Sequence, residues 1–272
     1  MKKKILFIIM AGLAVAISPI FAMTSKIPMD LGTPGIEKTL ILPVAADHSS
    51  VISLGNAVDP QTGKMVGGYA IIHYKNNNSK GSNGAKPGRT ICYGFLASGA
   101  KWKTLEPWVM NPTNTRGLDL TAVFNNESYN ITKWENAAGV DILGTGTQTS
   151  AALTADTVSP DGTNEVYFGS IQDNNAIAVT IVWGIFSGPA FQRKLVEWDQ
   201  VFDDSKFDWS LAGEADKMDF ENISTHELGH SVGMADLYNT CTNETMYGYA
   251  SEGEAKKRDL NTGDIAGVNQ LY

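Results

Sequence analysis

The chain has 272 residues, of which 43% are hydrophobic and 18% charged, and these proportions are typical of a globular protein. The formal net charge is −8 at pH 7 and no basic patch stands out, which argues against nucleic acid and anionic membrane surfaces as partners. The length suits one large domain, or one domain with an extension.

The N-terminus has the pattern of an export signal. Lys2 to Lys4 precede an apolar run from Ile5 to Ile17 and a short segment that ends at the small residue Ala22. This order is typical of a secretory signal peptide. The alternative is an uncleaved anchor, but the run is short for a membrane span and Pro19 follows it. We therefore expect residues 1–22 to be a signal peptide, and a secreted protein without stable membrane insertion after cleavage.

The next segment differs in composition from the rest of the chain. Short strand-like runs at 53–55 and 66–74 are followed by a polar stretch, Asn76 to Gly88, with the composition of a flexible linker. We interpret residues 23–88 as a pro-region or accessory segment. The alternative is that its strands join the main sheet.

Residues 89–272 have the alternating pattern of an αβ domain. A helix is predicted where apolar residues recur every three or four positions, and strands where short β-branched runs are bounded by turns. In chain order the expected elements are a strand at 107–110, a helix at 118–138 ended by Gly139, a strand at 140–143, a loop at 144–162, strands at 166–171, 176–183 and 195–202, and a helix at 219–232 with Asp219 as N-cap.

The last of these helices carries the sequence of a zinc site. Positions i and i+4 share one face of a helix, so His226 and His230 can bind one ion, and Glu227 lies beside it as a general base. Gly233 can take a positive φ and end the helix, which makes Asp236 the candidate third ligand. Two imidazoles, one carboxylate and an open fourth position are typical of catalytic zinc. The alternative is an ordinary amphipathic helix with two histidines.

The chain has two cysteines, Cys92 and Cys241. In an exported protein an even number suggests a disulfide. The alternative is that Cys92 occupies the zinc as a thiolate in a latent form, which would leave Cys241 unpaired.

The motifs together resemble a known family. Residues 226–236 match the zinc signature H-E-x-x-H-x-x-G-x-x-[H/D], Thr245-Met246-Tyr247 follows by a short loop, and residues 260–272 look like a closing helix. This order resembles the metzincin clan of metallopeptidases, in particular its matrixin-like branch. The resemblance implies an α+β, zincin-like catalytic domain over residues 89–272, with a twisted mixed five-stranded sheet, an active-site helix and a C-terminal helix.

The resemblance also implies a function. It implies a secreted zinc endopeptidase that cleaves extended peptide or protein substrates with a zinc-activated water and Glu227 as general base. Met246 would form an apolar floor beneath the metal, and Tyr247 or Tyr249 could donate a hydrogen bond to the oxyanion. A peptide would pair antiparallel with an edge strand, for which residues 176–183 are the best candidate. We also expect a monomer. The acidic loops leave calcium sites open as an alternative, and we predict none by residue.

The sequence departs from the clan at two positions of the site, and two rival functions are open. Asp236 stands where most of the clan has histidine, and Gly248 where some branches have a tyrosine. One rival is a gluzincin-type peptidase with Glu252 or Glu254 as the third ligand. The other is a non-catalytic secreted binding or surface protein with a vestigial zinc site.

Overall fold

The computed structural model describes residues 39–43, 49–76 and 91–272, which belong to one compact unit, residues 35–272. The expected signal peptide and almost all of the expected linker lie outside the described residues. Within the described part of the chain, no helix is long and apolar enough to cross a membrane.

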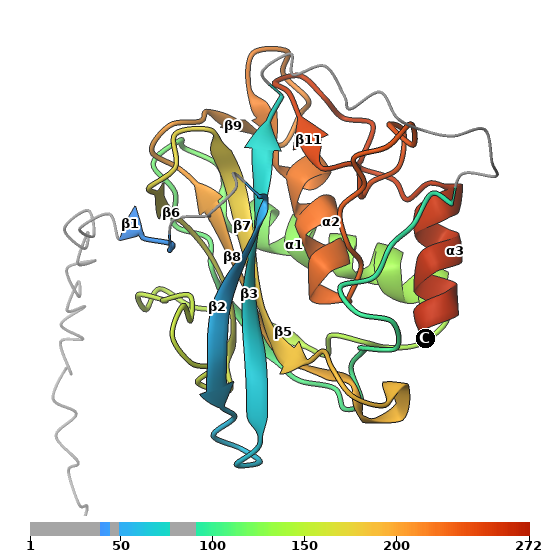
Figure 1. Ribbon diagram of the computed structural model, residues 1–272. Coiled ribbons are helices and arrows are strands. Elements are labelled where there is room, and N and C mark those ends of the chain that lie inside the picture. Colours follow the sequence, from blue (N-terminus) through green and yellow to red (C-terminus); the bar gives the residue numbers. More distant parts are fainter. Residues whose placement is uncertain (1–38, 44–48, 77–90) are drawn as a thin grey trace, which may run out of the picture. The chain divides into compact units, whose positions relative to one another are not determined.

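A mixed nine-stranded sheet organises the unit, with the order β11-β3-β7-β8-β6-β4-β5, while β1 pairs with β6 and β2 with β3 (Figure 1). The strands are β1 (Thr39–Leu40), β2 (Val51–Val58), β3 (Met65–Lys75), β4 (Trp108–Asn111), β5 (Gly146–Gln148), β6 (Asn164–Ile171), β7 (Ala176–Ile185), β8 (Lys194–Asp203) and β11 (Tyr249–Ala250). A separate pair is formed by β9 (Trp209–Ser210) and β10 (Met218–Asp219).

The α+β architecture is confirmed, but the sheet is larger than the expected five strands. Five strands from residues 108–203 do form its body, in the order β5-β4-β6-β8-β7, with β7 antiparallel to β8 and the other pairs parallel. The additional strands come from the ends of the chain. Residues 51–75 form an antiparallel hairpin, β2–β3, that joins the sheet beside β7. The alternative that these strands join the main sheet is therefore the observed arrangement.

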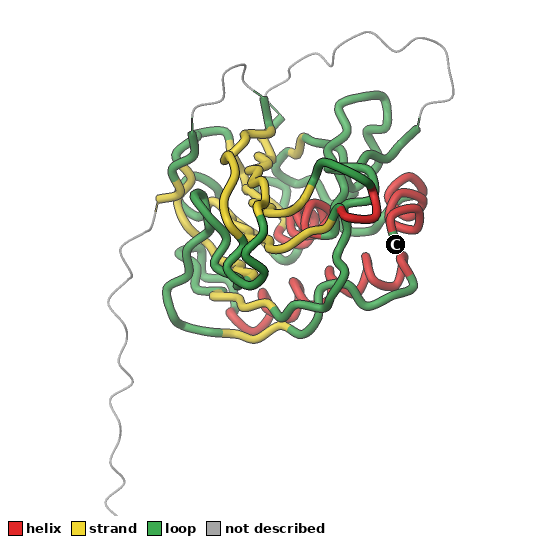
Figure 2. Tube along the Cα trace, turned by 60° about the horizontal axis from the view of Figure 1, so that its bottom comes forward, coloured by secondary structure: helices red, strands yellow, loops and turns green. Residues whose placement is uncertain are grey.

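Three α-helices lie on one face of the sheet (Figures 1 and 2). They are α1 (Leu120–Ala138), α2 (Phe220–Ser231) and α3 (Thr262–Leu271), and a short 3-10 helix spans Ala190–Gln192. The side chains of Asp119 and Asp219 accept hydrogen bonds from the first turns of α1 and α2, and Gly139 ends α1 at φ 69°. The predicted helices are confirmed to within two residues.

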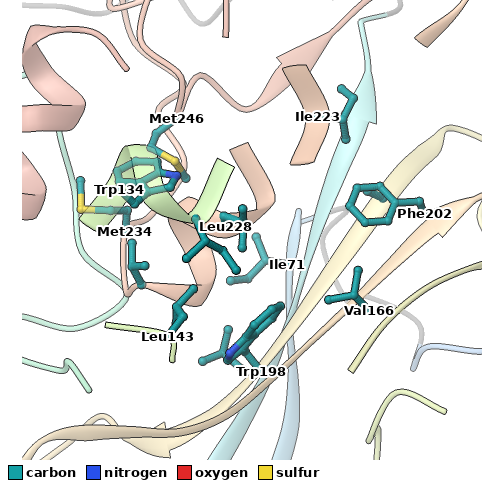
Figure 3. Close-up of a cluster of buried hydrophobic side chains, with 14 of the residues drawn as sticks. Ile71, Trp134, Leu143, Val166, Trp198, Phe202, Ile223, Leu228, Met234 and Met246 are labelled. Atoms are coloured by element: carbon teal, nitrogen blue, oxygen red, sulfur yellow. The ribbon is translucent and has the colours of Figure 1, made fainter. Parts of the chain in front are cut away.

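The main hydrophobic core fills the space between these helices and the sheet. Figure 3 shows Leu228 of α2 beside Ile71 of β3, and Trp134 of α1 beside Met246. All four side chains are almost completely buried. The core therefore fixes α2 against both α1 and the sheet, which is what a helix carrying a metal site requires.

Two expectations about strands are wrong. Residues 140–143 are not a strand, because the N–H groups of Ile142 and Leu143 donate to Glu135 Oε1 at 2.9 and 3.0 Å, and the strand forms three residues later as β5. Strand β7 is not an edge strand, because β3 pairs along its outer side.

Candidate active site

The two histidines of α2 and Asp236 converge on one point. The Nε2 atoms of His226 and His230 lie 3.1 and 3.4 Å from Asp236 Oδ1. Both imidazoles are fully buried. The turn that brings Asp236 back begins at Gly233, whose φ of 103° suits only glycine and where a Cβ would lie 2.9 Å from the Ala100 carbonyl oxygen.

Backbone carbonyls fix the orientation of both rings. The Nδ1 atom of His226 lies 2.6 Å from the Thr245 carbonyl oxygen, and that of His230 lies 3.0 Å from the Met234 carbonyl oxygen. Because a carbonyl can only accept, each Nδ1 carries the proton, which leaves the Nε2 lone pairs free to bind a metal.

The donor atoms of this group fit a zinc ion. His226 Nε2, His230 Nε2 and Asp236 Oδ1 are all buried, and no hydrogen bond satisfies any of them. A buried polar atom left without a partner costs about 1–3 kcal/mol, so three that converge indicate a place for a cation. Burial alone would raise the pKa of Asp236, but attraction to His230 and His226 holds it well below the usual range. The carboxylate is therefore charged and ready to bind.

Glu227 lies beside these atoms, completely buried. Its Oε2 accepts a 2.6 Å hydrogen bond from the Thr180 hydroxyl of β7, and its Oε1 lies 3.0 Å from His73 Nδ1 of β3. Burial raises the pKa of Glu227 to about 7. A carboxylate with such a pKa can both take and return a proton near neutral pH, as a general base must.

The sequence reasoning missed four residues of this site: His73, Thr180, Tyr238 and Lys257. Lys257 is fully buried, and its Nζ donates to His73 Nε2 at 3.2 Å and to the Tyr249 carbonyl at 2.7 Å. Tyr238 contacts Asp236, with 2.9 Å between its hydroxyl and Oδ2. Tyr238 is two positions from Asp236 and could have been found as a neighbour; the others come from distant parts of the chain.

Met246 is buried against the helix turn that separates the two histidines. A Cβ on Gly229 would lie 2.1 Å from Met246 Sδ, so the glycine makes room for the thioether. Tyr247 lies near Lys256, whose Nζ is 5.4 Å from its ring centre, and Tyr249 packs edge-on against Tyr238. Which of the two tyrosines assists the reaction stays a prediction.

The rival third ligands do not join the group. Glu252 pairs with Lys75 at 2.6 Å, and Glu254 lies 3.7 Å from Lys257 Nζ. Neither residue lies on a helix, and among the described residues neither forms part of a group of potential metal ligands. The gluzincin-type arrangement therefore finds no support here.

Cys92 and Cys241 form a disulfide with a Cα–Cα distance of 5.5 Å. Neither thiol is free to reach the metal group. The bond ties the start of the catalytic domain to the loop that follows Asp236.

A second cluster of potential metal ligands lies away from the histidines. Oxygen atoms of Asp156, Glu197 and Asp199 lie within 4.8 Å of one another. The side chains of Glu197 and Asp199 are buried, and both Glu197 Oε1 and Asp156 Oδ2 have no hydrogen-bond partner. We refer to these three residues as the acidic group.

The fold and the site together define a class. The sheet is mixed, and its antiparallel strand β7 passes the helix that carries the H-E-x-x-H sequence. A glycine turn, an aspartate and a buried methionine follow that helix. This is the architecture of a metzincin-type metallopeptidase. Residues 165–272 match the family model described as Matrixin, so the resemblance to matrixin-like peptidases seen in the sequence is confirmed over that part of the chain. Matrixins are zinc-dependent and act on peptide or protein substrates. A comparison with curated proteins found no match.

Proposed function

We propose that this protein is a secreted, monomeric zinc endopeptidase with His226, His230 and Asp236 as zinc ligands and Glu227 as general base. The observation that carries the proposal is the convergence of three buried, unsatisfied donor atoms beside a buried glutamate. Secretion and removal of residues 1–22 rest on the N-terminal sequence alone.

The roles of the chain's own residues follow from the geometry. Zinc, when bound, supplies the Lewis acidity that polarises the scissile carbonyl and activates water. Glu227 takes the proton of the attacking water and hands it to the leaving amine. Thr180 orients the carboxylate through its hydrogen bond to Oε2.

The first prediction tests the general base. Glu227→Gln should lower the rate of hydrolysis of an unfolded protein by about 10²- to 10⁴-fold, since general-base catalysis contributes about that much. Its zinc content, measured by mass spectrometry of the native protein, should not change. Glu221→Gln is a matched control on the same helix, because Glu221 pairs with Lys133 at 2.6 Å and does not face the site.

Two outcomes would contradict the proposal. Unchanged hydrolysis in Glu227→Gln would exclude Glu227 as the base. Stoichiometric zinc without hydrolysis of any unfolded protein would favour the binding-protein alternative.

We also propose that the acidic group binds calcium. Carboxylate oxygens are the ligands that calcium prefers, and within this group two of them have no other partner. Without a cation, three carboxylates this close must share protons, because their mutual repulsion opposes ionisation.

A further inference from the structure

We propose that a cavity at the end of β7, lined by three lysines and an exposed phenylalanine, binds an acidic segment of the protein substrate at a distance from the scissile bond. The inference rests on the proposed peptidase function and deepens it, because it names a class of substrate.

The cavity lies where β7 ends and β8 begins. Ile185 and Lys194 are cross-strand partners there, and the turn of the β2–β3 hairpin lies beside them because Gly67 pairs with Gly184 (Figure 1). The volume is about 510 Å³, within the range of about 300–1,000 Å³ that is usual for ligand pockets. Six residues line it: Lys64, Lys103, Ile185, Phe191, Gln192 and Lys194. We refer to them as the lysine cavity.

The charge of this cavity is opposite to that of the whole chain. Within the described part of the chain, Lys64 and Lys103 have no carboxylate partner, and Lys194 has only a distant one, Asp59 at 3.8 Å. Three ammonium groups that repel one another gain when an anion lies among them. Because the net charge of the chain is −8, an acidic partner is repelled by most of the surface and attracted here. The sequence showed no basic patch because the three lysines are far apart in it.

The cavity also offers an apolar contact. Phe191 is 77% exposed. It lies in the 3-10 helix Ala190–Gln192, and Arg193 holds that turn in place through bonds to the Gly188 and Ser98 carbonyls at 3.0 and 2.7 Å. A large aromatic side chain held outward on a fixed turn is typical of an anchor for a partner. A concave site with both charged and apolar walls favours a peptide segment over the flat surface of an anionic membrane.

The cavity lies at a distance from the reacting groups. Thr180 contacts Glu227, and Ile185 lies five positions further along β7, which corresponds to about 17 Å in a strand. Ile185 also packs against the hydrophobic cluster on the other face of the sheet. Since an extended chain covers at most about 3.6 Å per residue, more than about five residues must separate the acidic segment from the scissile bond. Short peptides should therefore not use the cavity.

The experiment compares two unfolded fluorogenic proteins that differ only in a C-terminal extension, which is rich in glutamate in one and in glutamine in the other. The zinc-loaded wild-type chain should cleave the glutamate form with a lower KM and the same kcat. Lys64→Glu and Lys103→Glu should each raise the KM for the glutamate form about fivefold or more, because one attraction is lost and one repulsion is added. The glutamine form should not respond.

Two controls accompany these variants. Lys217→Glu makes the same change of charge at an exposed lysine that does not line the cavity, and it should leave both KM values unchanged. Phe191→Ala should raise the KM for the glutamate form without a change of charge. The preference for the glutamate form should disappear between about 0.1 and 1 M salt, since the Debye length falls from about 10 to about 3 Å.

The outcomes separate the two proposals. Equal KM values for the two extensions at low salt, or equal effects of Lys217→Glu and Lys103→Glu, would overturn the role of the cavity. Lysine-dependent binding to vesicles of anionic lipid, without preference for the glutamate form, would assign the lysines to a membrane surface instead. If wild type hydrolyses neither protein, the peptidase function fails, whereas fluorescence anisotropy of the labelled glutamate form with wild type and Lys103→Glu still tests the cavity.

Discussion

At the scale of single residues, Tyr238 is the strongest candidate for a group that positions a metal ligand without touching the metal. A phenol has one proton and a carboxylate can only accept, so Tyr238 donates to Asp236 and accepts from Ser50. Tyr238→Phe should weaken zinc binding about 10- to 100-fold, the usual effect of losing such a partner, as measured by competition with a chromophoric chelator. Ser50→Ala keeps the bond to Asp236 and should retain wild-type affinity. Equal losses in the two variants would contradict this role.

Some residues of the site can be predicted from a local sequence pattern, and others cannot. His226, Glu227, His230 and Asp236 were predicted because helix geometry and one glycine turn place them locally, within eleven positions. His73 contacts Glu227 across 154 positions of sequence, and no local pattern encodes such a pairing. Its strand was instead interpreted as part of a separate segment.

At the scale of elements, helix α2 depends on the space that Gly229 leaves for Met246. Alanine normally favours a helix over glycine by about 0.8–1.0 kcal/mol. Here a Cβ would lie 2.1 Å from Met246 Sδ and 2.8 Å from Trp134, and such overpacking costs about 1–3 kcal/mol. Gly229→Ala should therefore lower the free energy of unfolding by up to about 2 kcal/mol, the overpacking cost less the gain in helix propensity, in urea denaturation with the disulfide intact.

A control outside the helix is Gly94→Ala, where the new methyl would lie 3.6 Å from the nearest atom, Ala235 Cβ. Its stability should stay close to wild type. If Gly229→Ala instead stabilised the protein, Met246 would be shown to move freely, and its role as a fixed floor beneath the ligands would lose its basis.

The strands show where sequence patterns and resemblance diverge. The predictions for 166–171, 176–183 and 195–202 are confirmed because apolar runs bounded by turns are local signals. The prediction that residues 176–183 form an edge strand was wrong, because it relied on the family resemblance, which favoured an edge strand at this place. Nine of the ten residues of β7 are buried, and a near-continuous apolar run of this kind is typical of a strand that is covered on both faces, as strands inside a sheet are. The partner strand itself lies about a hundred residues upstream, beyond any local pattern.

At the scale of the whole molecule, the acidic group should make stability depend on pH. Burial, and then the charges of Asp156 and Asp161, raise the pKa of Glu197 to about 8, and burial with Glu197 raises the pKa of Asp199 well above its usual range. Carboxyls with raised pKa values bind more protons in the folded than in the unfolded state. Their contribution to stability is therefore full below the unfolded pKa, about 4.5, and is lost as the pH rises toward 8.

In zinc- and calcium-free protein, the thermal midpoint should accordingly fall between about pH 5 and pH 8, and calcium should restore it at the higher pH by replacing the lost protons. Glu127 and Glu227, whose pKa values burial raises to about 7, act in the same direction, so the pH trend alone does not identify the group. Glu197→Gln separates the contributions: it should reduce the pH dependence to the part that Glu127 and Glu227 cause, and abolish the calcium effect. Calcium has little affinity for imidazole ligands, so the histidine site should not respond to it. A calcium effect that survives in Glu197→Gln would place the cation elsewhere, and the raised pKa values would then reflect shared protons alone.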